Sequence, residues 1–162
     1  MHPVAIAQIL ALLAVANGTP VLARRLLHDR WAWPVDGGLR FVDGRPVLGM
    51  SKTIRGIVVA LALTTVVAPL VGVTPIVGLW AAGAAMTGDL LSSFTKRRLG
   101  LPPSSRAAGL DQIPESLLPA LACQGALGFG AGDIVTVTGI FLVGEIVLSR
   151  LLYRWRIRER PY

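Results

Sequence analysis

An acidic residue inside an apolar segment is the first feature of this sequence that could do chemistry. Asp89 lies in the segment 76–94, which consists mainly of small and apolar residues. A carboxylate inside a membrane is costly and commonly serves binding or transport. Ser92 or Ser93, and then Lys96, follow Asp89 at helical spacing, so one helix would carry a polar stripe up to a basic end. We interpret Asp89 as a functional residue; the alternative is that it pairs with other helices and serves only packing.

Two further polar residues are expected at a similar depth. Asp89 precedes Lys96 by seven residues and Asn17 precedes Arg24 by the same number, which at about 1.5 Å per residue puts both roughly 10 Å below the basic ends of their helices. Glu145 lies five residues before the next basic residue. Polar groups at one level on three helices are what a cavity open to one membrane face needs. Interhelical pairing is the alternative, and for Asn17 and Glu145 the sequence favours neither.

The segment 111–115 supplies a second candidate carboxylate, Asp111. In a purely structural interpretation, Asp111 lies near the cap of a helix, Pro114 occupies the first turn and Glu115 interacts favourably with the helix dipole. In the functional interpretation, Asp111 and Asp89 meet through a divalent cation. Mg²⁺ is usually held by one or two carboxylates together with substrate phosphates and water. The sequence leaves both interpretations open.

The segment that precedes the second apolar stretch is rich in glycine and basic residues. Glycine lets backbone amides approach a phosphate closely, and side chains such as Lys52 and Arg55 would neutralise its charge. The GxxxxGK[ST] spacing of an ATPase P-loop is absent. The alternative is a set of turns with solvated charges beside anionic lipid, and taken alone the segment favours phosphate binding only weakly.

The composition indicates that a membrane protein carries these residues. Of the 162 residues, 53% are hydrophobic and 15% are charged, whereas about a quarter are charged in a soluble domain. Five apolar stretches approach the length of about 20 residues that a membrane-spanning helix needs. We therefore predict an all-α integral membrane protein with one transmembrane domain over residues 1–162. The predicted transmembrane helices are about 3–23, 54–72, 76–94, 114–130 and 134–152.

The distribution of charge predicts the orientation. All 16 Lys and Arg residues lie in or beside the loops of about 24–53 and 95–113 or near the C-terminus. By the positive-inside rule these loops and the C-terminus are cytoplasmic and the N-terminus is outside. The basic pair Arg24-Arg25 follows the first apolar run instead of preceding it, so we predict a retained helix and not a signal peptide. The expected location is the cell (cytoplasmic) membrane, with the polar site facing the cytoplasm.

Other classes of function are disfavoured by the inventory of residues. The only histidines, His2 and His28, have no second His or Cys at metal-ligand spacing, and Cys123 is the only cysteine. The tryptophans fit interfacial or buried membrane positions, so the net charge of +7 does not indicate nucleic acid. Membrane lipids are expected partners, and a homo-oligomer is compatible with the sequence.

Taken in order, the polar motifs resemble the CDP-archaeol synthase family, relatives of the CDP-diacylglycerol synthases. The resemblance runs from the first predicted helix to the fourth. It is carried by Asn17-Gly18-Thr19-Pro20-Val21, Pro34-Val35-Asp36-Gly37, Asp43-Gly44-Arg45, Leu48-Gly49, Lys52-Thr53-Ile54-Arg55-Gly56, Gly88-Asp89, Ser93-Phe94-Thr95-Lys96-Arg97-Arg98-Leu99-Gly100 and Leu110-Asp111-Gln112.

The resemblance implies an enzyme that transfers a cytidylyl group from CTP to a lipid phosphate and requires Mg²⁺. Asp89 and Asp111 would bind the metal and, with Lys96, form the catalytic set. Residues at the remaining motif positions would bind CTP or the lipid phosphate: Asn17, Lys52, Thr53, Arg55, Ser93, Arg97 and Gln112. A non-enzymatic transporter or lipid-binding protein with a polar cavity around Asp89 is the alternative.

The chain departs from the family pattern at two places. Family members commonly have Gly-Asp-Gly-Lys-Thr where this chain has Gly49-Met50-Ser51-Lys52-Thr53. The residue after Leu-Asp-Gln-x is often acidic, whereas here it is Pro114, followed by Glu115. The His-Gly-Gly element of the diacylglycerol-type enzymes is absent. The sequence does not distinguish an ester-linked from an ether-linked lipid substrate.

Overall fold

The computed structural model describes residues 1–102, 105, 107 and 109–154, of which 149–154 are described only as backbone. Within these residues the chain is helical and has no β-strand, so the predicted all-α architecture is confirmed for this part. The elements are α1 (Pro3–Leu27), α2 (Ile54–Val67), the 3₁₀-helix η1 (Ala68–Val71), α3 (Pro75–Arg98), α4 (Gln112–Ala122), α5 (Gln124–Leu127) and α6 (Ala131–Arg154). Four basic residues of the predicted cytoplasmic segments lie outside the described residues: Arg106, Arg156, Arg158 and Arg160.

Within the described residues, three helical stretches are long and apolar enough to cross a membrane: Pro3–Leu27, Ile54–Val71 and Ala131–Leu148. Helix α3 covers the third predicted span, but Asp89 and several Gly, Ser and Thr residues lower its hydropathy. The fourth predicted span, about 114–130, is not one helix. Pro119 lacks the N–H that would bond the carbonyl four residues earlier, and α4 ends three residues later at Ala122, before the single turn of α5.

Small residues allow the first three helices to pack closely. A Cβ atom on Gly78 of α3 would lie 2.6 Å from the Cβ of Ala68 and 2.8 Å from the carbonyl oxygen of Thr64, so the two backbones approach at this point as they do at small-residue contacts in membranes. The buried residues around this contact come from all three helices: Ile9, Leu13 and Ala16 of α1, Ala60 and Thr64 of α2, and Ala81, Ala82 and Ala85 of α3.

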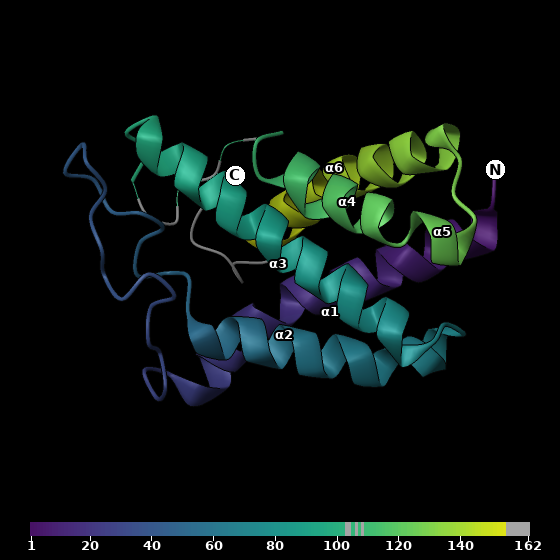
Figure 1. The fold of residues 1–162 in the computed structure, drawn as a ribbon, viewed down its shortest axis with the longest axis horizontal. Helices are drawn as coiled ribbons and strands as arrows, with labels where there is room; N and C mark the ends of the chain where they lie inside the picture. The colour runs from purple at the N-terminus through teal and green to yellow at the C-terminus, as the bar shows by residue number, and fades with distance from the viewer. Residues whose placement is uncertain (103–104, 106, 108, 155–162) are drawn as a thin grey trace.

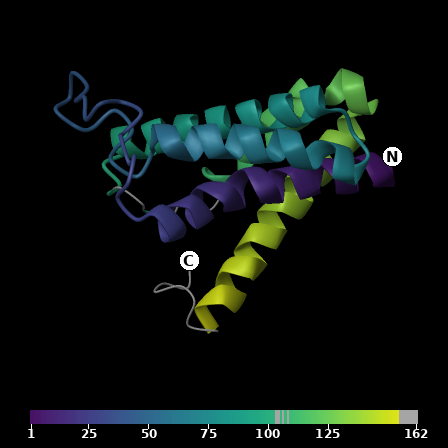
Figure 2. The same cartoon turned by 90° about the horizontal axis from the view of Figure 1, so that it is seen from below.

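The helices are arranged so that the polar loops meet at one end. Helix α3 lies between α2 and α4 (Figure 1), α4 also packs against α6, and α6 diverges from α1 towards its C-terminus (Figure 2). Helix α1 ends, α2 begins and α3 ends on the same side of the molecule, at the left of Figure 1, and the N-terminus lies at the opposite end. We call the former the loop end.

A hairpin of residues 39–47 is attached to the last turn of α3. The amide of Val47 donates to the carbonyl of Leu39 (3.0 Å), which closes the hairpin. Arg98 of α3 binds Asp43 (2.7 Å) and the carbonyl of Pro46 (2.5 Å), and Arg45 donates to the carbonyl of Arg98 (2.5 Å). These contacts satisfy a carbonyl that the helix end leaves open, and they fix the first loop to α3.

Gly88 sets the contact between α3 and the start of α4. A Cβ atom at residue 88 would lie 2.3 Å from the carbonyl oxygen of Pro114 and 2.7 Å from the amide nitrogen of Glu115. Both are backbone atoms of a helix, so they have little freedom to move aside. Residue 88 must therefore be glycine for α4 to lie against α3 beside Asp89.

We predict that Gly88→Ala lowers stability strongly, by more than the 1–3 kcal/mol typical of an overpacked core, because the clash is with backbone. The measurement is thermal unfolding of the purified protein in detergent. Gly83→Ala in the same helix is the matched control, since its Cβ would meet only the Cδ2 of Leu61 at 3.9 Å. Equal stability of the two variants would contradict the proposed contact.

Candidate active site

An ion pair between the first loop and α3 lies at the centre of the candidate site. The Nζ of Lys52 lies 2.6 Å and 2.5 Å from the two carboxylate oxygens of Asp89. The two side chains retain 21% and 22% of their exposure, so the pair is shielded but reachable. The structure therefore brings together two of the predicted residues that lie 37 positions apart in the sequence.

The backbone around Lys52 is fixed on both sides. The amide of Val35 donates to the carbonyl of Lys52 (2.8 Å), and Pro34 and Thr53 form an isolated bridge. Thr53 is the N-cap of α2, and its hydroxyl accepts a hydrogen bond from the amide of Gly56 (3.2 Å), which satisfies one of the open amides at the helix start. Lys52 is thus held one residue before a capped helix.

A buried carboxylate, Asp36, fixes the same loop from within. It is 8% exposed and accepts hydrogen bonds from the amides of Leu48 (2.8 Å), Gly49 (3.1 Å) and Gly38 (3.0 Å). Burial raises the pKa of the Asp36 carboxyl, but the three N–H donors together outweigh it and hold this pKa below its ordinary value. Sequence analysis gave Asp36 no role of its own, although its position in a Val-Asp-Gly-Gly turn is typical of a side chain that binds nearby amides.

Arg55 supports the wall of the site from α2. Its guanidinium donates to the carbonyl of His28 (3.0 Å) and to that of Arg30, and the side chain is 8% exposed. His28 and Trp31 adopt positive φ angles of 48° and 53°, a costly conformation for residues other than glycine. Arg55 therefore holds a strained turn that follows α1, and its predicted role in phosphate binding stays a prediction.

A cavity of about 580 Å³ opens beside the Lys52–Asp89 pair, within the size range of small-molecule sites. Its walls come from the second half of α1, the turn after it, the loop before α2, the start of α2 and the middle of α3. The lining residues are Pro20, Arg24, His28, Asp29, Ala32, Met50, Ser51, Lys52, Thr53, Arg55, Gly56, Ile57, Met86, Asp89 and Leu90. Four of the predicted site residues, Lys52, Thr53, Arg55 and Asp89, are among them.

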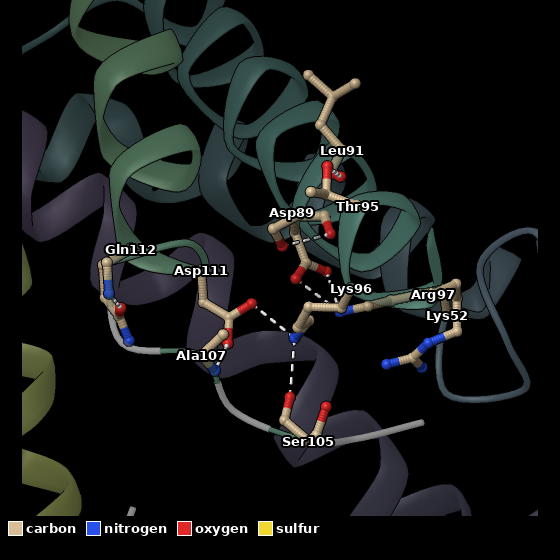
Figure 3. Close-up of polar contacts among 12 residues, drawn as sticks. Lys52, Asp89, Leu91, Thr95, Lys96, Arg97, Ser105, Ala107, Asp111 and Gln112 are labelled. Carbon is tan, nitrogen blue, oxygen red and sulfur yellow. Dashed lines mark hydrogen bonds and ion pairs between the residues drawn. The ribbon is translucent and has the colours of Figure 1, made fainter. Parts of the chain in front are cut away.

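A second lysine–carboxylate pair lies two helical turns beyond Asp89, on the same side of α3 and closer to its C-terminus (Figure 3). The Nζ of Lys96 lies 2.6 Å from the carboxylate of Asp111 and donates to the carbonyl of Ser105 (2.9 Å). Asp111 also accepts a hydrogen bond from the amide of Ala107 (3.0 Å). Neither Lys96 nor Asp111 lines the cavity, so the predicted residues form two adjacent clusters.

The remaining predicted residues surround these clusters. Gln112 donates to Glu145 of α6 (3.0 Å) and accepts from the amide of Gly109 (2.8 Å). Arg97 is 3% exposed and donates to the carbonyl of Pro102 (2.6 Å), and Ser93 is also buried. The Nδ2 of Asn17 is buried and has no hydrogen-bond partner among the described residues. A buried donor of this kind can bind a ligand or an ordered water molecule.

Glu115 is a site residue that sequence analysis did not include. It is 9% exposed, and the carboxyls of Asp89 and Glu145 and the ammonium of Lys52 lie near enough to act on it. The sequence signal was available: Glu115 follows Asp111 by four residues, so a helix places both on one face. Sequence analysis assigned Glu115 only to the helix dipole because the close α3–α4 contact at Gly88 was not foreseen.

The oxygen donors of the site suit a hard cation such as Mg²⁺. Within the described part of the chain, no group of three or more His, Cys, Asp or Glu side chains is arranged around one metal position. Mg²⁺ does not require such a group, because one or two carboxylates with substrate phosphates and water suffice. Asp89 and Asp111 each bind a lysine ammonium, so both carboxylates already lie where a positive charge is stabilised.

Known proteins of similar sequence decide the family. No family model matches the chain. The CDP-archaeol synthase of Hyperthermus butylicus is 39% identical over 154 residues, covering 90% of this chain and 87% of that protein. The CDP-archaeol synthase of Pyrobaculum arsenaticum is 43% identical over 153 residues, covering 91% of this chain and 92% of that protein. The chain belongs to the CDP-archaeol synthase family. The resemblance inferred from the motifs is thereby confirmed.

A solved structure of similar fold supports the assignment of the chain to this family. A protein described as an intramembrane enzyme for archaeal membrane lipids biosynthesis matches the chain with a TM-score of 0.71 and 30% sequence identity, over 87% of this chain and 90% of that chain. Together with the apolar helices, this match identifies a multi-pass membrane protein. The two departures from the family pattern are close to the site: Met50 and Ser51 line the cavity, and Pro114 contacts Gly88.

We predict that Asp36→Ala loosens the loop that carries Lys52, because three amides lose their acceptor. The amide of Gly49 is buried, and leaving it without a partner costs about 1–3 kcal/mol. The measurement is amide hydrogen exchange over residues 34–53, which should become faster. Asp29→Asn is the matched control, since Asp29 is an exposed loop carboxylate and exchange should not change. Equal exchange in the wild type and Asp36→Ala would remove this role.

The same carboxylate makes the loop sensitive to acid. The pKa of Asp36 is lower in the folded protein than in the unfolded chain, so its stabilisation is fully present above the ordinary pKa of about 3.9. It is lost as the pH falls through the lower folded-state pKa. The ratio of the protection factors of wild type and Asp36→Ala should therefore be constant near neutral pH and approach one in acid; a ratio that grows in acid would contradict the assignment.

Proposed function

We propose that this protein transfers the cytidylyl group of CTP to a lipid phosphate, forming a CDP-lipid and releasing pyrophosphate for membrane lipid synthesis. The observation that carries the proposal is the Lys52–Asp89 pair beside a cavity of about 580 Å³ in a chain related to CDP-archaeol synthases over about nine-tenths of its length. The cavity is lined by the basic residues Arg24, Lys52 and Arg55 and by apolar residues such as Ile57 and Met86. A transporter or lipid-binding protein is not favoured, since the relatives are synthases.

The reaction makes modest demands on protein side chains. An oxygen of the lipid phosphate, already anionic at neutral pH, attacks the α-phosphorus of CTP, and the bond from that phosphorus to the bridging oxygen of the β-phosphate breaks. Pyrophosphate leaves with the electron pair, so no protein nucleophile is needed. The protein has to bring anionic groups together, align them and compensate the charge that develops on the leaving group.

The residues around the cavity suit this task. Lys52 and Arg55, with the hydroxyl of Thr53, would hold phosphate oxygens within the cavity. Lys96 would keep Asp111 in place and approach the phosphates from the C-terminal end of α3. The remaining predicted phosphate ligands would complete the site from α1, α3 and α4: Asn17, Ser93, Arg97 and Gln112. The last three already bond within the protein or are buried, so positioning is their more direct contribution.

Mg²⁺ is the cofactor that we assign to this reaction. Asp89 and Asp111 are the carboxylates that would hold it, and Glu115 lies beside Asp89. When bound, a divalent cation neutralises phosphate charge and orients the displacement.

We further propose five membrane crossings with the N-terminus outside and the loop end in the cytoplasm. Helix α3 and the pair α4–α5 would supply the two crossings that hydropathy does not identify, with their polar residues turned towards the site. The support is that the charged loops share the loop end (Figure 1) and that basic loops stay on the cytoplasmic side. CTP would then enter from the cytoplasm and the lipid from the membrane.

We predict that Asp89→Asn and Asp111→Asn each abolish turnover, by more than about 100-fold, while the protein still inserts and purifies, because each loses charge on a buried carboxylate that binds cations. The assay measures pyrophosphate release from labelled CTP with Mg²⁺, using phosphatidic acid and its ether-linked archaeal counterpart in parallel. Asp133→Asn is the control and should retain activity, because Asp133 binds His2 at the end of the molecule opposite the loop end. Near-normal turnover of either variant would remove that residue from the metal site, and turnover without lipid phosphate would contradict the proposed reaction.

A further inference from the structure

The cavity contains one carboxylate that the proposed reaction leaves without a role. Three cations line the walls, Arg24, Lys52 and Arg55, and Lys52 is neutralised by Asp89. Asp29 also lines the cavity, and no side chain of the described residues forms an ion pair or hydrogen bond with its carboxylate. A free carboxylate repels a triphosphate, so the part of a bound molecule that suits Asp29 is uncharged and rich in hydrogen-bond donors.

The backbone that carries Asp29 is held in place. The amide of Ala32 donates to the carbonyl of Asp29 (3.3 Å), and Arg55 binds the carbonyls of His28 and Arg30 on either side of it. The turn also contains positive φ angles at His28 and Trp31. Strained conformations persist where surrounding contacts enforce them, and they are common at binding sites. Asp29 is therefore presented by a fixed turn and not by a freely moving loop.

The groups near Asp29 fit a flat ring. Ala32 belongs to the same turn, and Met50 lies on the facing loop; both line the cavity. A thioether makes favourable contacts with an aromatic ring, and a small methyl side chain leaves space for one. A carboxylate beside two apolar side chains matches the edge and faces of a base better than it matches the hydroxyl groups of a sugar.

We propose that Asp29 selects cytosine by accepting a hydrogen bond from the exocyclic amino group of the base, with Ala32 and Met50 against its faces. This inference rests on the proposed function and names the base-specificity residue of that same cavity. Acidic side chains accept from this amino group in the recognition of cytosine. Uracil carries a carbonyl oxygen at the same position, which a carboxylate repels, so the chemistry also explains how UTP would be rejected.

The test compares CTP with UTP and dCTP in the purified full-length protein, with Mg²⁺ and with phosphatidic acid or its ether-linked archaeal counterpart as the lipid phosphate. The wild type should prefer CTP over UTP. Asp29→Asn should lower kcat/KM for CTP about tenfold, chiefly through KM. It should also lower the ratio of kcat/KM for CTP to kcat/KM for UTP about tenfold or more, because an amide can donate a hydrogen bond to the uracil oxygen. The ratio does not depend on how much protein is folded. Asp29→Glu should retain part of the preference, and Asp133→Asn, at the end opposite the loop end, should retain all of it.

The outcomes separate this inference from the proposed function. A wild type that prefers CTP, with an unchanged ratio in Asp29→Asn, overturns the role of Asp29 and leaves the reaction standing. The role of Asp29 in base selection is also overturned if the variant changes the preference in kcat/KM for CTP over dCTP but not that for CTP over UTP. Asp29 would then bind the ribose. A wild type that turns over CTP and UTP equally also overturns the inference alone. No turnover of CTP by the wild type overturns the reaction and the base site with it.

Discussion

The charge of Asp89 is the constraint on which the site depends. A carboxylate in the middle of an apolar bundle is stable only if a positive charge or several donors compensate it. Here the compensation comes from Lys52, whose ammonium binds both oxygens. Because Lys52 belongs to a loop and not to a helix, the loop itself must be ordered. Asp36, the cap at Thr53 and the attachment of the hairpin to α3 supply that order.

Helix α3 connects the two clusters of the site. Asp89 faces the cavity and Lys96 faces Asp111, so one rigid helix sets the spacing between two lysine–carboxylate pairs. Gly88 allows the start of α4 to come beside Asp89, which brings Glu115 into the same environment. The geometry of a binding site for anionic substrates thus depends on a position with no side chain at all. Gly88 sets the packing of α4 against α3, and its neighbour Asp89 supplies the carboxylate of the site.

Much of this arrangement could be predicted from the sequence, because membrane helices leave clear patterns. Hydropathy predicted helices at the right places, and the family resemblance identified Lys52, Asp89, Lys96 and Asp111 as site residues that the structure places in two neighbouring pairs. The fourth predicted helix is interrupted after Ala122, between Pro119 and Gln124, two residues that weaken its apolar pattern. The sequence alone does not place the break, because a proline inside a membrane helix does not always end it. Glu115 and Asp36 were missed for a different reason: their environments arise from contacts between segments that are separated in the sequence, and a single sequence does not show such contacts.

The order of the two partners along the chain has a consequence for synthesis. Lys52 is made before Asp89 and lies on the loop that precedes α2, so the ammonium is already at the membrane surface when α3 follows. Domains and segments emerge and fold from the N-terminus onwards. The counter-charge of Asp89 is therefore already part of the chain when α3 is made. The cavity is complete only when α3, which carries Asp89, packs against α2 and the loop of Lys52. A complete cavity therefore indicates that these segments are correctly assembled.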